Sequence, residues 1–272
     1  MYQGLDVHRN PLPSARIAED LRWFADTYAH DPAFGLFGRP VVVITGTDRF
    51  GVEELERVVE PVRDRLTVLA SAKEVEEYRR TAPALDGDAY YWSSGDPAAP
   101  GFAAKLDQMA QAVRGDGGLW FAPAPVGFDA RDLGGHRVVA RNDGETLRRA
   151  MAAAGASRPD AVAVISWNEF SENSHAEPSQ EYGTTVLDML ARITGGSAAF
   201  AGALPGTDAA VGGTASDEAG PDGSGLPSWA ALTVVAAGAG LTALAAARAR
   251  RGGRHRADSR SGGAPGPDRE EE

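Results

Sequence analysis

The sequence of 272 residues is long enough to bury a sizeable core, and its 43% hydrophobic and 24% charged residues are ordinary values for a globular protein. The formal net charge of −11 argues against nucleic-acid binding, because the 27 Lys and Arg residues are scattered and form no basic face. The absence of cysteine excludes disulfides, thiolate metal sites and cysteine nucleophiles.

Five continuously apolar runs predict buried β-strands. Continuous rather than alternating apolar residues are typical of parallel strands that are covered on both faces. The five runs are residues 40–46, 66–71, 89–94, 119–124 and 161–167. Apolar side chains at helical spacing predict amphipathic helices, and these lie within residues 17–28, 52–62, 102–113 and 186–193.

The alternation of these strands and helices predicts an α/β fold. A leading helix followed by five βα units would form a partial (β/α)8 TIM-type barrel, consisting of about the five C-terminal units. A five-stranded doubly wound sheet is the alternative, but no Gly-rich phosphate-binding loop follows any of the strands. We therefore expect a partial barrel over residues 1–195.

The composition changes after Gly196. Residues 196–228 are Gly-rich and acidic, which predicts a flexible extracellular linker. The nineteen uncharged residues from Trp229 to Ala247 (229–247) predict one transmembrane helix, and an Ala-rich buried helix is the alternative. The basic-then-acidic tail of residues 248–272 begins with an Arg cluster, which predicts a cytoplasmic C-terminus.

This topology predicts a single-pass protein of the cell membrane, with residues 1–195 outside the cell and contact with the lipid bilayer through residues 229–247. The N-terminal segment MYQGLDVHRNPLPSARIAEDL has no basic start, apolar core or cleavage site, and is not a signal peptide. We therefore expect either an export signal and further barrel strands upstream of Met1, or a truncated product.

Acidic residues follow directly after the last predicted strand. Ligands of parallel α/β domains meet the carboxyl ends of the strands, so Asn168 and Glu169 lie at that edge and Glu172 follows one turn later. Two carboxylates beside the aromatic Trp167 suit cleavage of a glycosidic bond, in which one group protonates the leaving oxygen and the other assists attack. Solvated surface charge is the alternative for two Glu three residues apart.

The segment SWNEFSENSHAEPSQEYG, residues 166–183, resembles the signature of family 99 glycoside hydrolases and their relatives in polysaccharide processing. Similar segments are GRPVVVITG (38–46), APVGFDARD (124–132) and VARNDGETLRRAM (139–151). The resemblance covers about residues 18–193 and is specific over residues 119–183. Phe170 stands where Trp is commoner, and Ser171 and Asn173 replace a frequent His and Gly, which alters the turn that aims Glu172.

The resemblance implies a (β/α)8 barrel whose catalytic pair lies in this motif. It implies that Glu169 assists attack by the substrate's own 2-hydroxyl, and that Glu172 acts as general acid and then base, without a metal or other cofactor. The family's best-known members cleave α-mannosidic linkages within a chain, with retention. The residues expected to bind substrate are Trp167, Asn168, Asp129, Arg141, Glu177 and Tyr182.

Some of these residues have a second interpretation. Asp129 can bind a sugar hydroxyl or cap the next segment, and Arg141 can face the cleft or pair with Asp143. Trp92 and Trp120 are candidate sugar platforms, with packing in the core as the favoured alternative.

We predict a membrane-anchored glycoside hydrolase-like protein that acts on cell-surface or extracellular glycans by carboxylate acid/base catalysis. The expected partner is a polysaccharide or glycan, and nucleic acid is not expected. The alternatives are a non-catalytic, truncated surface module that binds carbohydrate or a partner, and a protein of polysaccharide assembly.

Overall fold

The computed structural model describes residues 1–194. The predicted linker at residues 196–228, the apolar stretch at 229–247 and the charged tail at 248–272 lie outside the described residues. Within residues 1–194, no helix combines the length and the apolar character that are needed to cross a membrane.

Parallel β-strands form the centre of the described part. Three strands pair in the order β1-β2-β3 and three in the order β4-β5-β8, and a parallel bridge between Ala70 and Asp88 links the two sets. The parallel strands are β1 (Tyr2–Gln3), β2 (Val41–Thr45), β3 (Thr67–Leu69), β4 (Gly87–Ala89), β5 (Leu119–Pro125) and β8 (Ala161–Ile165).

The order of the strands distinguishes the two architectures that the sequence leaves open. Each parallel strand lies beside the next one along the chain, from β1 to β5 and then β8, and the order never reverses. A doubly wound sheet reverses its strand order at a switch point, whereas a (β/α)8 barrel adds its strands one after another. The predicted α/β fold with parallel strands is confirmed, and the strand order is that of a barrel.

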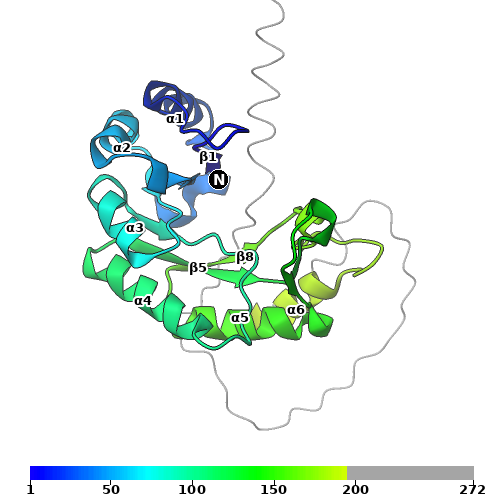
Figure 1. Cartoon of the computed structure of the whole chain (residues 1–272). Coiled ribbons are helices and arrows are strands. Elements are labelled where there is room, and N and C mark those ends of the chain that lie inside the picture. The colour runs from blue at the N-terminus through cyan, green and yellow to red at the C-terminus, as the bar shows by residue number, and fades with distance from the viewer. Residues whose placement is uncertain (195–272) are drawn as a thin grey trace, which may run out of the picture. The chain divides into compact units, whose positions relative to one another are not determined.

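A helix follows each parallel strand. Figure 1 shows α1 to α5 as consecutive coils along the outside of the strands, from blue to green. The helices are α1 (Ser14–Tyr28), α2 (Val52–Val59), α3 (Val75–Thr81), α4 (Phe102–Gly115), α5 (Glu145–Ala156) and α6 (Thr185–Thr194). The apolar repeats predict α1, α2, α4 and α6. They miss α3, which is only seven residues long, and α5, whose buried face has only two large apolar side chains, Leu147 and Met151.

Both faces of the strands are covered, which explains their continuous apolar sequence. Trp120 of β5 is fully buried in the cluster between the strands and the helices. The next residue, Phe121, belongs to a second cluster with Leu69, Ala89 and Ala161 of the neighbouring strands. Ala89, Phe121 and Ala161 are register partners, so they lie at one level of the sheet, as side chains that fill the interior of a barrel do.

The third predicted strand, at residues 89–94, is wrong in its position. The structure places β4 at Gly87–Ala89, and residues 90–94 form the loop that follows it. Leu119 of β5 approaches Gly87 so closely that an added Cβ would lie 2.1 Å from the Leu119 oxygen. The strand therefore begins at a glycine, which the apolar pattern does not mark. As a consequence, Tyr91 and Ser93 lie at the carboxyl edge of the sheet instead of within it.

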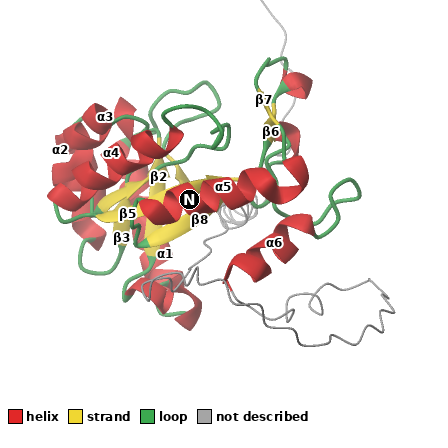
Figure 2. Ribbon diagram, turned by 90° about the horizontal axis from the view of Figure 1, so that it is seen from below, coloured by secondary structure: helices red, strands yellow, loops and turns green. Residues whose placement is uncertain are grey.

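An antiparallel hairpin interrupts the connection between β5 and α5. It consists of β6 (Phe128–Asp129) and β7 (Val138–Val139), which pair with each other. Figure 2 shows the hairpin beside one end of α5 and apart from the parallel strands. The hairpin and the loop after β8 together form the region in which most of the predicted site residues lie.

The buried carboxyl group of Asp88 on β4 is expected to make stability depend on pH. Its Oδ1 accepts a 2.7 Å hydrogen bond from the Ala72 N–H, and Oδ2 has no hydrogen-bond partner among the described residues. Burial raises the pKa of Asp88 well above its ordinary value. A carboxyl group whose pKa is higher in the folded than in the unfolded state stabilises the fold while it is protonated. This contribution is complete below the pKa of the unfolded state, about 4, and is lost as the pH rises through the pKa of the folded state.

The Asp88→Asn variant is expected to lose less stability than the parent between pH 5 and pH 8. The carboxyl group contributes a slope of up to about 1.4 kcal/mol per pH unit in its window, and Asn keeps the acceptor for Ala72 without an ionisable group. Urea unfolding at the two pH values measures the difference. Asp64→Asn, at an exposed position, is the matched control and should behave as the parent does. An unchanged pH dependence in Asp88→Asn would rule out this role.

Candidate active site

The loop that follows β8 is closed by its own backbone. The Ser166 N–H donates to the Ser174 oxygen at 2.8 Å, and the Ala176 N–H donates back to the Ser166 oxygen at 2.8 Å. The Glu177 N–H donates to the Trp167 oxygen at 2.8 Å. These bonds tie the two ends of the loop together, so that the residues between them form a fixed turn at the carboxyl end of β8.

The two predicted catalytic acids lie on this turn. Glu169 is exposed and its backbone N–H donates to the Ser166 Oγ at 3.1 Å. Glu172 is half-buried and ends the short 3-10 helix η7 (Phe170–Glu172). The hydroxyl of Ser93 donates to the Glu172 Oε2 at 3.1 Å. Since Ser93 follows β4, loops from two strand ends meet at Glu172.

Tyr91 lies on the same loop after β4 as Ser93. Burial raises its pKa, and the negative charges of Glu169 and Glu172 raise it further, while a hydrogen bond with Ser166 acts in the opposite direction. The phenol therefore keeps its proton at neutral pH and can donate a hydrogen bond. The loop after β4 thus carries a hydroxyl that donates to Glu172 and a phenol whose pKa is raised by the charges of both acids.

Arg141 holds the end of the turn that carries Glu172. Its Nη2 donates to the backbone oxygen of Asn173 at 3.0 Å and to the Asn173 Oδ1 at 3.2 Å. Asn173 directly follows η7 and has a φ of 48°, in the left-handed region that Asn tolerates better than most residues. The guanidinium lies 4.1 Å from the ring centre of Tyr182, and burial lowers the pKa of Arg141. Arg141 thus contacts the turn rather than Asp143.

His175 is buried and packs against the turn. Its Nδ1 lies 3.3 Å from the Arg141 Nη2, and because a guanidinium only donates, Nδ1 is the acceptor and Nε2 carries the proton. Burial and then the charge of Arg141 lower the pKa of His175. The ring stacks on Phe170 with centres 4.1 Å apart. Phe170 is therefore held in place between Glu169 and Glu172 by a neutral, buried imidazole.

The other predicted site residues lie around the turn in different settings. Asp129 binds the Arg131 side chain and accepts from the Arg131 N–H at 3.0 Å, so its carboxylate is engaged by the start of η5, and Arg131 lowers its pKa to about 2. Asn168 is exposed, and the half-buried Trp167 packs against the core cluster. Glu177 closes the loop through its backbone N–H. The Tyr182 hydroxyl accepts from the Asn173 Nδ2 at 2.9 Å.

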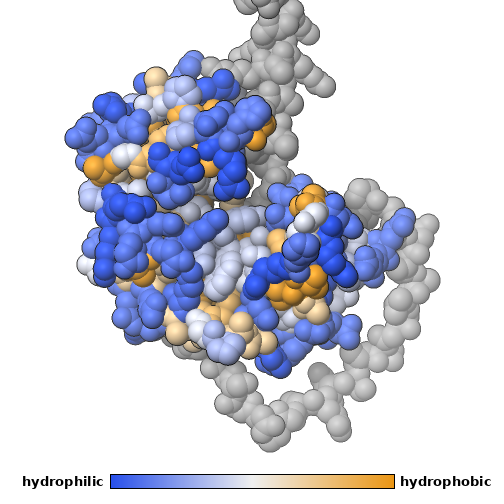
Figure 3. Space-filling model, in the orientation of Figure 1, coloured by the Kyte–Doolittle hydropathy of each residue, from blue (hydrophilic) through white to orange (hydrophobic). Residues whose placement is uncertain are grey.

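The surface around the acids carries exposed apolar side chains. Phe170 is 50% exposed, and on the hairpin segment Leu133 is 58% and Val138 48% exposed. The short helix η5 (Arg131–Leu133) packs against η7, so the hairpin and the turn are neighbours. In Figure 3, apolar side chains gather at the right of the view, over the green segment of Figure 1, among hydrophilic ones. Apolar and carboxylate groups side by side suit a sugar, which has an apolar ring face and polar edges.

A cavity of about 380 Å³ lies beside the turn, between the hairpin, the start of α5 and the loop before α6. Asp129, Arg141 and Tyr182 line it, and Glu169 and Glu172 do not. The predicted site residues thus fall into two adjoining regions. One is the turn that carries Glu169 and Glu172, called the acid turn below, and the other is this cavity. Within residues 1–194, no group of three or more His, Cys, Asp or Glu residues is placed to hold a metal ion.

Tyr91 and Ser93 are the site residues that the sequence does not reveal. They lie in an apolar run that predicts a strand, and the hydrogen bond of Ser93 to Glu172 depends on which loops the fold brings together. The signal present is their place next to a strand end, the edge at which parallel α/β domains bind ligands.

Comparisons with known proteins agree with this description at the level of the fold. No protein-family model and no curated protein matches the sequence. Among solved structures, the GH99 endo-alpha-mannosidase from Bacteroides thetaiotaomicron matches with a TM-score of 0.54 and 18% sequence identity, over 62% of this chain and 54% of that chain. A second structure of that mannosidase, in complex with Bis-Tris-propane, matches equally well, with 56% of its chain covered.

The chain spans about half the length of these solved structures. At 18% identity the likeness establishes the fold, and the resemblance predicted from the sequence is confirmed to that extent. The described residues therefore have the glycosidase-like fold of the GH99 TIM-barrel structures, over part of the barrel.

Proposed function

We propose that this protein is a membrane-anchored glycoside hydrolase that acts on cell-surface or extracellular glycans through Glu169 and Glu172. The observation that carries the proposal is the meeting of two strand-end loops at these acids, where the Ser93 hydroxyl donates to the Glu172 carboxylate. The fold shared with an endo-alpha-mannosidase supports glycan chains as substrates and α-mannosidic linkages as the first to test.

The proposed reaction divides the work between the two acids. Glu172 gives its proton to the glycosidic oxygen as the bond from that oxygen to C1 breaks. Glu169 takes the proton of the 2-hydroxyl as O2 bonds to C1. Water then attacks C1 as the C1–O2 bond breaks, Glu172 takes a proton from the water, and Glu169 returns its proton to O2. Two inversions at C1 give net retention.

The neighbouring residues would support these steps. Ser93 donates to Glu172 Oε2, which fixes one carboxyl oxygen and leaves the other for the proton transfer. Arg141 fixes Asn173, the residue that ends the turn, and so limits where Glu172 can point. Trp167, Asn168, Asp129, Glu177 and Tyr182 remain proposed substrate-binding residues.

The proposed location is the cell membrane, with residues 229–247 as the single span, residues 1–195 outside and the Arg-rich tail inside. The support is the length of the uncharged stretch and the cluster of Arg residues that follows it. Protease treatment of intact cells that carry an N-terminal epitope tag tests this: loss of the tag from intact cells supports the topology, and its protection refutes it.

A second candidate function is a glycan-binding module without catalysis. The observation in its favour is that the chain spans about half the length of the mannosidase structures. Polysaccharide assembly is the third possibility, since the resemblance includes such relatives.

Incubation of the full-length protein with α-mannose oligosaccharides and mannan separates these candidates. Chromatography of the products measures cleavage, and calorimetry measures binding of the same probes. Cleavage supports the hydrolase, and binding without cleavage supports the module. If the protein neither cleaves nor binds any glycan of a broad panel, both candidates are refuted.

Phe170→Ala is expected to raise KM about 3- to 10-fold with a smaller change in kcat. The ring is half exposed, lies between the two acids in the chain, and is stacked on His175, so it offers a fixed apolar face to a sugar ring. Michaelis kinetics on an α-mannose oligosaccharide measures the split. Phe170→Trp is the matched control and should restore the parent's KM. A parent-like KM in Phe170→Ala would exclude the stacking role.

A further inference from the structure

The cavity beside the acid turn has the construction of a binding site of its own. It measures about 380 Å³, which is within the range of small-molecule pockets. The β6–β7 hairpin and the start of α5, which follow one another in the chain, enclose it together with the loop before α6. The floor is apolar, formed by Val126, Phe128, Val139, Leu147 and Val186.

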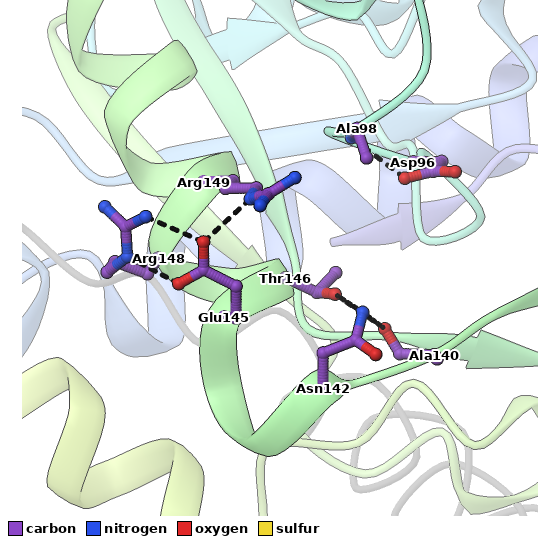
Figure 4. A network of polar contacts seen from close by, with 8 residues as sticks. All are labelled: Asp96, Ala98, Ala140, Asn142, Glu145, Thr146, Arg148 and Arg149. Carbon is purple, nitrogen blue, oxygen red and sulfur yellow. Dashed lines mark hydrogen bonds and ion pairs between the residues drawn. The ribbon is translucent and has the colours of Figure 1, made fainter.

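The rim of the cavity is polar and rigid. Asn142, Asp143 and Gly144 follow one another with φ of 48°, 51° and 88°, a left-handed run that non-glycine residues rarely adopt. Figure 4 shows how the run is fixed: the Asn142 amide is bonded to the Ala140 oxygen and the Thr146 hydroxyl, at 3.3 and 3.2 Å. These bonds hold Asn142 in place, and Asp143, which follows it, lines the cavity.

The charges around the cavity restrict what it can bind. Asp129, Asp143 and Glu181 line it together with a single cation, Arg141. Asp129 is paired with Arg131, whereas neither Asp143 nor Glu181 has an ion-pair partner among the described residues. The Nη2 of Arg141 is hydrogen-bonded to Asn173 and contacts His175, whereas its buried Nε and Nη1 have no hydrogen-bond partner among the described residues. One cation thus stands against the two unpaired carboxylates. The cavity is therefore net negative, and it disfavours a carboxylate or sulfate on the ligand.

We propose that this cavity is a separate subsite that holds one uncharged hexose unit of the glycan, away from the bond that is cleaved. The inference rests on the proposed function for the identity of the glycan. An apolar floor suits the face of a hexose ring, and two unpaired carboxylates at the rim accept hydrogen bonds from its hydroxyl groups.

The subsite adjoins the acid turn through Asn173. This residue lines the cavity and directly follows Glu172, and its amide donates to the Tyr182 hydroxyl, another part of the cavity wall. A glycan chain that places one unit in the cavity would therefore run on towards the acids. Longer oligosaccharides should reach both places and shorter ones only one.

The test measures how affinity depends on chain length. Full-length protein carrying Glu172→Gln, which prevents cleavage, is titrated calorimetrically with α-1,3-linked mannose oligosaccharides of two and six units. We expect the hexasaccharide to bind about 10-fold or more tightly than the disaccharide. Val138→Trp, which fills the cavity from a half-exposed position, and Glu181→Ala are each expected to abolish most of this gain. The exposed Asp64→Asn is the control and should keep it.

A second probe tests the charge argument. The same hexasaccharide oxidised at C6 carries carboxylates and should show no gain over the disaccharide. A gain that survives in Val138→Trp and Glu181→Ala overturns the proposal, as does tight binding of the oxidised probe, or no binding of any probe. If the parent cleaves no glycan but the gain is present and lost in both variants, the subsite stands and the proposed hydrolase activity fails.

Discussion

Glu172→Gln is expected to lower kcat for hydrolysis of an α-mannose oligosaccharide by about 10²- to 10⁴-fold. Gln keeps the size of the side chain and an acceptor for the Ser93 hydroxyl, but it has no proton to give to the leaving oxygen. The turn itself is held by backbone bonds and by Arg141, so the fold should be retained. Steady-state kinetics and thermal unfolding of the variant measure the two effects separately.

The leaving group provides the internal check. The acidic phenol of an aryl α-mannoside leaves as a phenolate without being protonated. The rate of the bond-breaking step on this substrate should therefore fall much less in Glu172→Gln. Glu76→Gln, an exposed Glu on α3, is the matched control and should keep the parent's kcat. An equal loss on both substrates would contradict the acid role of Glu172, and no loss on either would remove it from the mechanism.

Trp120→Ala is expected to lower the free energy of unfolding by about 3–5 kcal/mol. The side chain has no exposed surface and lies in the cluster between the strands and the helices. Its Nε1 donates to the Ser157 hydroxyl at 2.9 Å, a bond that joins β5 to the end of α5. The variant would lose the burial, leave a large cavity and remove the donor to the Ser157 hydroxyl, which would keep its bond to the Ala154 oxygen.

Urea unfolding of the parent and two variants measures this. Trp120→Phe keeps most of the packing and loses the hydrogen bond, so its loss should be clearly smaller than that of Trp120→Ala. A Trp120→Ala protein of parental stability that binds glycan less tightly would show that Trp120 is a sugar platform after all. The burial favours the core role that the sequence also favours.

The fold could be predicted where burial on both faces dictates the sequence. β2, β3, β5 and β8 are continuously apolar because side chains pack on each side of them, and α4 shows four apolar residues at helical spacing that are all buried. The two-residue β1 is too short to leave a pattern. β4 is displaced because its first residue is a glycine, placed there by the close approach of Leu119.

The candidate site was predictable in its position and less so in its contacts. Glu169 and Glu172 follow a buried strand, and the strand-end rule puts them at the edge of the sheet. Which groups face them depends on how separate loops meet, so Ser93 and Tyr91 have no local signal. The contact of Arg141 with Asn173 follows from the hairpin inserted after β5, which spacing alone cannot place.

The most direct test of the account is product release from α-mannan by the parent and by the Glu169→Gln and Glu172→Gln variants, at equal concentrations of folded protein. We predict that the parent releases oligosaccharides and that each variant releases at least about 100-fold less. Equal release by all three proteins, or release by none while the parent is fully folded, would contradict the claim that these two acids form a catalytic pair.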